Sequence, residues 1–100
     1  MNSKSENLFN KINKVIHEPA RLNIMKNLYV VESADFIYLL QQTELTDGNL
    51  SSHLKKISAA KFIKVKKKFK GNKPVTLISI TETGRNAFEE YVENMKNILN

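Results

Sequence analysis

The stretch LTDGNLSSHLKKI, residues 45–57, decides the fold that we expect this chain to adopt. Leu50, Leu54 and Ile57 recur at intervals of four and three residues, which places them on one stripe of an α-helix. The opposite side of that helix carries small residues, hydroxyl and amide groups and two lysines, with no large apolar side chain. The pattern predicts a short helix whose outer face suits a polar, negatively charged groove.

The beginning of this helix combines a capping signal with one unusual residue. Thr46 is a favourable N-cap, and Asp47 places a negative charge where the helix dipole is positive. Gly48 follows, although glycine costs about 1 kcal/mol relative to alanine inside a helix. Two interpretations stay open. The missing side chain lets the helix end approach something bulky, or a first-turn glycine has no functional meaning.

The preceding residues predict two further helices. Residues 36–42 form a short helix that reaches the first stretch through a tight connection at 43–45, which makes the pair a helix-turn-helix. A longer helix over 19–31 comes before it, because Pro19 suits the first helical position, and residues 34–36 predict a very short strand between the two. The inner stripe of the longer helix is predicted to be Leu22, Met25, Leu28 and Tyr29, with Arg21 and Lys26 facing out.

A helix is also predicted at the N-terminus, over residues 4–17. Ser3 and Glu6 fit a capping box, and apolar residues follow at helical spacing. His17 then lies at the C-terminal end, where a cation is favourable, and we interpret it as a cap.

After residue 60 the apolar period changes from helical to alternating. Ile63 and Val65 alternate with lysines, Phe69 keeps the same parity, and residues 76–80 alternate again. Residues 70–74 predict the turn between these strands, because glycine and asparagine tolerate positive φ. A helix-turn-helix followed by such a lysine-tipped hairpin is the winged-helix arrangement. The fold class is therefore mainly α with a small β-hairpin.

The last predicted helix is capped by Thr81 and runs to the end of the chain. Its apolar residues form a heptad-like seam that exceeds what a small core absorbs. Together with the N-terminal helix it is our candidate dimer interface, the alternative being that both helices pack on their own domain. The predicted interface residues are Leu8, Phe9, Ile12, Phe88, Tyr91, Val92, Met95, Ile98 and Leu99.

The basic residues are concentrated in one segment of the chain. Residues 51–73 contain nine lysines and no acidic residue, whereas the remainder contains seven basic and ten acidic residues. Such a concentration is the footprint of a polyanion-binding face. Attachment to a membrane surface is the weaker interpretation, because a hairpin lacks the apolar face of an interfacial helix.

Length and composition favour one cytoplasmic domain over residues 1–100, with a core at 19–80 between terminal segments 1–18 and 81–100. The absence of cysteine excludes disulfides and thiolate metal sites. No signal peptide and no membrane-length apolar run are visible, which makes the cytoplasm the expected location. No catalytic constellation is visible either, so we expect neither an enzyme nor a cofactor. His53 lies beside the inner stripe and has no second histidine at metal spacing, so we expect a hydrogen-bonded structural role.

Three segments, residues 16–24, 45–57 and 80–85, resemble the winged-helix transcriptional regulators, in particular the compact single-domain members of the MarR/ArsR-like set. The resemblance covers almost the whole chain and implies a dimeric, sequence-specific DNA-binding regulator. It implies a recognition helix at 46–56 in the major groove and a wing at 66–73 on the backbone or in the minor groove. The implied DNA-binding residues are Thr46, Asp47, Gly48, Asn49, Ser51, Ser52, Lys55, Lys56, Lys66, Lys67, Lys68, Lys70 and Lys73.

The sequence departs from the family pattern at two places. Lys61 stands where relatives usually have glycine in a left-handed conformation, which costs another residue roughly 1 kcal/mol. The wing carries lysine where relatives often have arginine, and lysine lacks the planar fork that reads bases. We therefore expect the wing to bind phosphate more than to read sequence. Metal-sensing relatives need cysteines or carboxylate–histidine clusters, so no metal site is predicted.

The function predicted from the sequence is that of a homodimeric regulator bound to a near-palindromic double-stranded operator. Two alternatives stay open: a winged helix that binds protein, and a protein that binds nucleic acid without sequence preference. No feature selects a small-molecule effector.

Overall fold

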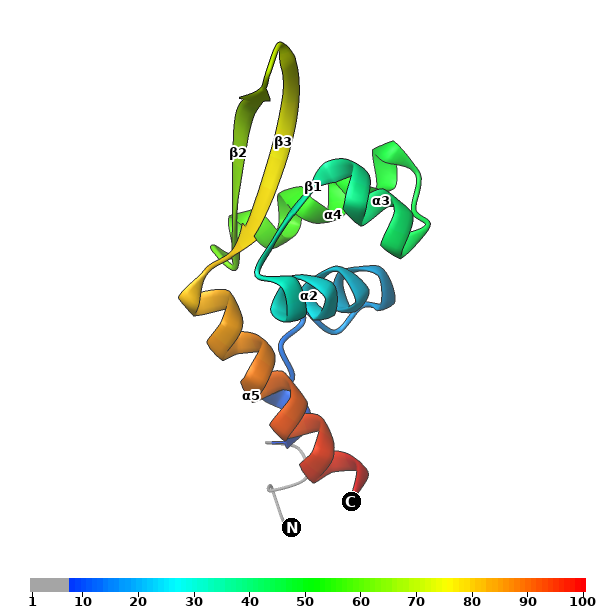
Figure 1. The fold of residues 1–100 in the computed structure, drawn as a ribbon. Coiled ribbons are helices and arrows are strands. Elements are labelled where there is room, and N and C mark those ends of the chain that lie inside the picture. The colour runs from blue at the N-terminus through cyan, green and yellow to red at the C-terminus, as the bar shows by residue number, and fades with distance from the viewer. Residues whose placement is uncertain (1–7) are drawn as a thin grey trace.

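The structure, a computed structural model, describes residues 8–100 of the chain. Helices α2 to α4 form a lobe, with a β-hairpin projecting from one end and the last helix from the other (Figure 1). This is a winged helix-turn-helix fold, mainly helical with a small sheet, as predicted. The elements are α2 (Pro19–Val31), β1 (Ser33–Asp35), α3 (Phe36–Thr43), α4 (Asp47–Ala59), β2 (Ile63–Lys70), β3 (Lys73–Ile80) and α5 (Glu82–Leu99).

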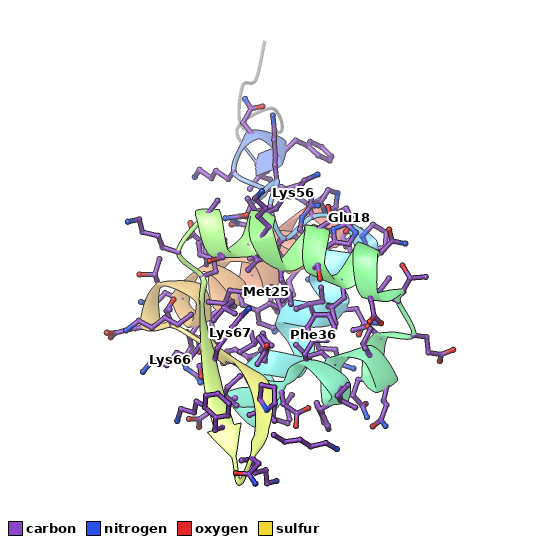
Figure 2. The ribbon with its side chains drawn as sticks, turned by 90° about the horizontal axis from the view of Figure 1, so that it is seen from above. Glu18, Met25, Phe36, Lys56, Lys66 and Lys67 are labelled. Carbon is purple, nitrogen blue, oxygen red and sulfur yellow. The ribbon has the colours of Figure 1, made fainter. Side chains whose placement is uncertain are left out.

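The core lies between α2, α3, α4 and the base of the sheet. Leu50, Leu54 and Ile57 are buried on the inner side of α4, which confirms the stripe predicted from their spacing. Met25 of α2 lies fully buried beneath α4, near the centre of the view in Figure 2. The residues with no exposed surface are Ile16, Ile24, Met25, Leu28, Leu39, Leu50, Ile57 and Ile78. This core fixes α4 with its polar side outwards.

The three strands pair antiparallel in the order β1-β3-β2. β1 pairs only with Leu77–Ser79 of β3, so the outer halves of β2 and β3 project as a two-stranded hairpin. Alternation then divides the side chains of β2 between two faces. Ile63, buried in the core, defines the inner face, and Lys64 lies on the outer one.

The hairpin loop is shorter than predicted. Only Gly71 and Asn72 separate the strands, and Gly71 has φ +65°. Glycine at the first position of a two-residue loop is the requirement of a type II′ turn, which matches strand twist. Pro74 therefore lies inside β3, opposite Phe69. It is tolerated there because β1 does not extend far enough to need its N–H.

A junction around residues 61–84 attaches α5 to the lobe. Lys61 adopts the left-handed conformation with φ 67°, although it is not glycine. Its carbonyl accepts a hydrogen bond of 2.7 Å from the hydroxyl of Thr81, which also accepts from the N–H of Gly84 at 2.9 Å. Thr81 is thus the N-cap of α5, as predicted, and its second bond stabilises the strained conformation of Lys61.

The helix predicted over residues 4–17 is wrong within the described part of the chain, and its proposed capping residues Ser3 and Glu6 lie outside that part. Among residues 8–18, only 8–10 are helical. The side-chain oxygen of Asn13 accepts hydrogen bonds from the N–H groups of Val15 and Ile16, at 3.0 and 3.1 Å. An asparagine that bonds its local backbone competes with the helix, and here it turns the chain so that Ile16 enters the core.

Two side-chain roles differ from the predictions for the same region. His17 does not cap a helix, because its Nδ1 lies 2.8 Å from the hydroxyl of Tyr91 on α5. Arg21 does not simply face solvent, because its Nε–H donates to the carbonyl of Val15 at 2.6 Å. Both residues instead connect the N-terminal segment to the lobe and to α5.

Candidate nucleic-acid interface

The outer face of α4 presents hydrogen-bonding groups on a rigid support. The hydroxyl of Thr46 accepts from the N–H of Asn49 at 3.1 Å, which confirms the predicted N-cap. The eight predicted residues from this helix and its cap are all exposed: Thr46, Asp47, Gly48, Asn49, Ser51, Ser52, Lys55 and Lys56. No exposed large apolar side chain lies on α4.

The space around Gly48 is open. A β-carbon added there would meet nothing within 4 Å. Internal packing therefore does not explain this glycine, and the first turn of α4 leaves room for an external surface to approach the helix backbone.

The lysines of the hairpin occupy both of its faces. Lys64, Lys66, Lys68 and Lys70 share the outer face of β2, whereas Lys67 lies on the inner face, opposite Thr76 of β3. Figure 2 shows Lys66 and Lys67 on opposite sides of the strand. The five predicted wing residues, Lys66, Lys67, Lys68, Lys70 and Lys73, are all exposed.

An open groove of about 650 Å³ joins α4 to the inner face of the hairpin. Lys55 of α4 and Lys67 of β2 line it together, so the structure brings part of the two predicted binding segments into one surface. Lys56 lies on the other side of α4 from Lys67 (Figure 2). The other groove residues are Phe36, Ser51, Leu54, Ser58, Ala59, Val65 and Thr76.

The positive charge of this surface is not neutralised internally. Within residues 8–100, no lysine lies at ion-pair distance from a carboxylate. Unpaired cations on one surface attract a polyanion, and the attraction weakens as salt screens it.

A polar cluster connects α4 to the beginning of α2. Nη1 of Arg21 donates to Nδ1 of His53 at 3.2 Å, and the carboxylate of Glu18 lies 3.8 Å from the same nitrogen. Glu18 is the N-cap of α2, and the hydrogen bond that it accepts from the N–H of Arg21 lowers the pKa of its carboxyl group. His53 is thus a hydrogen-bonded structural residue, as predicted, and the cluster holds α4 against the beginning of α2.

α5 packs on the core through Phe88 and Tyr91, and its C-terminal end is more exposed. Phe88 and Tyr91, both predicted interface residues, are buried within the chain, and burial raises the pKa of the Tyr91 hydroxyl. A hydrogen bond from Tyr29 to Glu89, which raises the pKa of the tyrosine, ties α2 to the same helix. Of the other predicted interface residues, Phe9, Val92 and Leu99 are exposed, and Leu8, Ile12, Met95 and Ile98 are half-buried.

In the part of the chain that the structure describes, none of the helices has the length and apolar character of a membrane span. No group of three or more histidine, cysteine, aspartate or glutamate side chains within residues 8–100 is placed to hold a metal ion.

Sequence reasoning missed the apolar part of this surface. Phe36, Leu54 and Val65 contribute to the groove beside α4, and Phe69 is exposed on the hairpin. The alternation of β2 places Val65 and Phe69 on one face of the hairpin. The sequence does not indicate which face lies towards α4, because that depends on how the sheet packs.

Comparison with known proteins agrees with this geometry. The family model of the winged helix DNA-binding domain matches residues 20–99, and the chain belongs to that family. An uncharacterized protein of Methanocaldococcus jannaschii is 39% identical over 79 residues, which are 79% of this chain and 86% of the relative.

Several solved structures share the fold. A transcriptional regulator homologue from Pyrococcus horikoshii has a TM-score of 0.86 at 26% identity, covering 94% of both chains. A DNA-bound structure of reduced AbfR has a TM-score of 0.77 at 14% identity, covering 96% of this chain and 66% of AbfR.

Proposed function

We propose that this protein is a sequence-specific transcriptional regulator that binds double-stranded DNA. The observation that carries the proposal is the exposed polar face of α4 beside a hairpin whose lysines pair with no carboxylate of residues 8–100. Membership of a DNA-binding domain family supports it, as does the likeness to the Pyrococcus regulator homologue. A winged helix that binds protein is less well supported, because no exposed large apolar residue lies on α4.

The two parts of the surface have different tasks in this proposal. α4 enters the major groove, where Asn49 has the chemistry to pair with adenine and Lys55 with guanine. The hairpin lysines contact phosphates, which hold the protein on the duplex without selecting a sequence. We further propose that residues 19–80 form the DNA-binding core and that α5 carries dimerisation.

Replacing Asn49 by alanine tests base recognition. At one base pair, the N49A variant is expected to discriminate the preferred base from the others about tenfold less than wild type, which is within the range of a bidentate contact. Its salt dependence stays that of wild type. The matched variant Lys56→Gln weakens the binding of all duplexes alike. It lowers the slope of log affinity against log salt concentration by about 0.9. Anisotropy titrations against a duplex selected from a random pool, and its single-base variants, measure both effects. Equal discrimination by N49A and wild type would exclude Asn49 from base recognition.

We propose that two copies associate through the exposed apolar residues of α5 and the N-terminal segment. Val92 and Leu99 are 36% and 76% exposed, on the C-terminal half of α5, and Phe9 is 59% exposed. Burying such side chains in a second copy removes them from water. A two-fold dimer then reads a near-palindromic operator whose half-sites lie about one helical turn apart.

Light scattering of the purified protein tests the dimer. Wild type is expected at twice the chain mass of 11.5 kDa. The double variant Val92→Glu, Leu99→Glu becomes monomeric, because each buried charge is unpaired at the interface. The matched double variant Val30→Glu, Ile37→Glu changes two exposed apolar residues outside α5, at 72% and 60% exposure, and stays dimeric. A wild-type mass of one chain at micromolar concentration would contradict the proposal.

A further inference from the structure

Phe69 is an apolar side chain in the most basic part of the protein. It is 77% exposed, the largest value among the large apolar residues that the structure describes. It lies next to the last residue of β2, two residues before Gly71 of the hairpin loop. Nothing within residues 8–100 buries it, so packing in the described part of the chain does not explain its presence there.

The strand register gives Phe69 a direction and a support. It is paired with Pro74 of β3, so an aromatic ring and a rigid pyrrolidine ring share one face near the hairpin tip. That face is the one on which Val65 and Lys67 line the groove beside α4. Phe69 therefore projects from the hairpin on the side of the recognition surface.

The surroundings of Phe69 identify the kind of partner. Lys67 shares the face of Phe69, whereas Lys68, Lys70 and Lys73 lie on the other face of the hairpin tip. None of these lysines is at ion-pair distance from a carboxylate within the described chain. A purely apolar protein surface that enclosed the tip would leave these ammonium groups buried without partners, at a high cost. The minor groove of DNA is bordered by two phosphate backbones, and its base steps admit apolar wedges that partly unstack them.

We propose that Phe69, supported by Pro74, is an apolar wedge that enters the minor groove next to the α4 site and kinks the duplex. The proposal rests on the proposed function, because it assigns a task to one residue of the same interface. Proteins that insert phenylalanine or leucine between base steps bend DNA by about 20–90° towards the major groove. The lysines on the two hairpin faces then lie near the two phosphate strands that border the groove.

This wedge adds a source of specificity that makes no base hydrogen bond. Pyrimidine–purine steps such as TA unstack more easily than others. A site with such a step under the hairpin is therefore bent at lower cost, and the protein favours it. The sequence preference contributed by Phe69 concerns deformability, whereas that of Asn49 concerns base edges.

Energy transfer between dyes at the two ends of a 30-base-pair duplex selected by the wild type tests the wedge. Wild type is expected to raise the transfer efficiency, because bending brings the ends together. F69A loses this rise and binds roughly tenfold more weakly, the scale of a lost aromatic–base contact, with an unchanged salt slope. F69L retains most of the bend, because leucine also serves as a wedge. The matched variant Ile37→Ala, at an exposed apolar residue of α3, bends DNA like wild type.

The outcomes separate this proposal from the proposed function. Thermal denaturation of F69A checks that the hairpin stays folded, which is expected for so exposed a residue. If wild type selects a duplex but F69A bends it equally, the wedge is wrong and the regulator proposal stands. If wild type selects no sequence and bends no duplex, including one with a central TA step, both are wrong.

Discussion

Replacing Gly84 by alanine is expected to lower the free energy of unfolding by about 3 kcal/mol, the upper part of the range for overpacking a tight site. A β-carbon at this position would lie 2.1 Å from the backbone oxygen of Phe62 and 2.8 Å from its carbonyl carbon. The obstacle is backbone, so no side-chain rotation relieves it, and α5 has to move away from the beginning of β2. The midpoint of thermal unfolding falls by roughly 12–24 °C for a domain of this size.

Gly48→Ala is the matched control for this prediction. Both glycines lie in the first turn of a helix, but the space around Gly48 is empty. There the substitution raises stability by up to about 1 kcal/mol through helix propensity alone. Circular dichroism melts of the two variants and wild type decide the matter. A G84A melt within 3 °C of wild type would show that the contact between α5 and Phe62 is not tight.

Neutralising four lysines of the hairpin is expected to have the largest effect on DNA binding. The variant with glutamine at Lys66, Lys67, Lys68 and Lys70 should lower the log–log salt slope by about 3.6 per protomer, at 0.9 for each phosphate contact. Near physiological salt the same loss weakens binding roughly 10³-fold. All four residues are exposed, so the fold is not expected to change.

A second quartet of lysines provides the control for charge alone. Lys11, Lys14, Lys26 and Lys96 are also exposed, and all lie outside the hairpin and α4. Replacing them by glutamine changes the net charge equally and leaves the slope close to that of wild type. Anisotropy titrations at four salt concentrations compare the two variants. Equal slopes for the two quartets would show that net charge, and not the hairpin, binds DNA.

Much of the fold follows from local patterns in the sequence. The spacing of Leu50, Leu54 and Ile57 defines the inner side of α4, and the hydroxyls of Thr46 and Thr81 mark where α4 and α5 begin. Alternation from Ile63 onwards predicts β2 in the same way. These signals are reliable because each depends on residues at most four positions apart and is reinforced by burial in one core.

The failures have physical causes outside such short windows. The spacing of apolar residues near the N-terminus is helical, yet the side-chain oxygen of Asn13 bonds the backbone of Val15 and Ile16, and the chain turns so that Ile16 is buried in the core. Tertiary packing overrides the local pattern there. The part of the α5 seam that stays available to a second copy also depends on packing, because Tyr29 of α2 covers Phe88 and His17 contacts Tyr91.

In the candidate site, too, some features follow from local sequence patterns and others depend on tertiary packing. All thirteen predicted DNA-binding residues are exposed, because polar residues opposite an apolar stripe stay in water. The segregation of Lys66 from Lys67 was implicit in strand alternation, but the direction of each face depends on the sheet order and on how α4 packs. Phe69 has the same parity in β2 as the buried Ile63, and the length of the hairpin shows that Phe69 itself extends beyond the core.

A competition titration tests the central claim, sequence-specific recognition by α4 and the hairpin, most directly. A labelled duplex selected from a random pool is bound at near-physiological salt and displaced either by its unlabelled copy or by a scrambled duplex of equal composition. The account predicts that the scrambled duplex competes at least about 10³-fold more weakly, as for specific DNA-binding proteins. Equal competition by the two duplexes, with binding lost as salt rises, would contradict it and leave only an electrostatic patch.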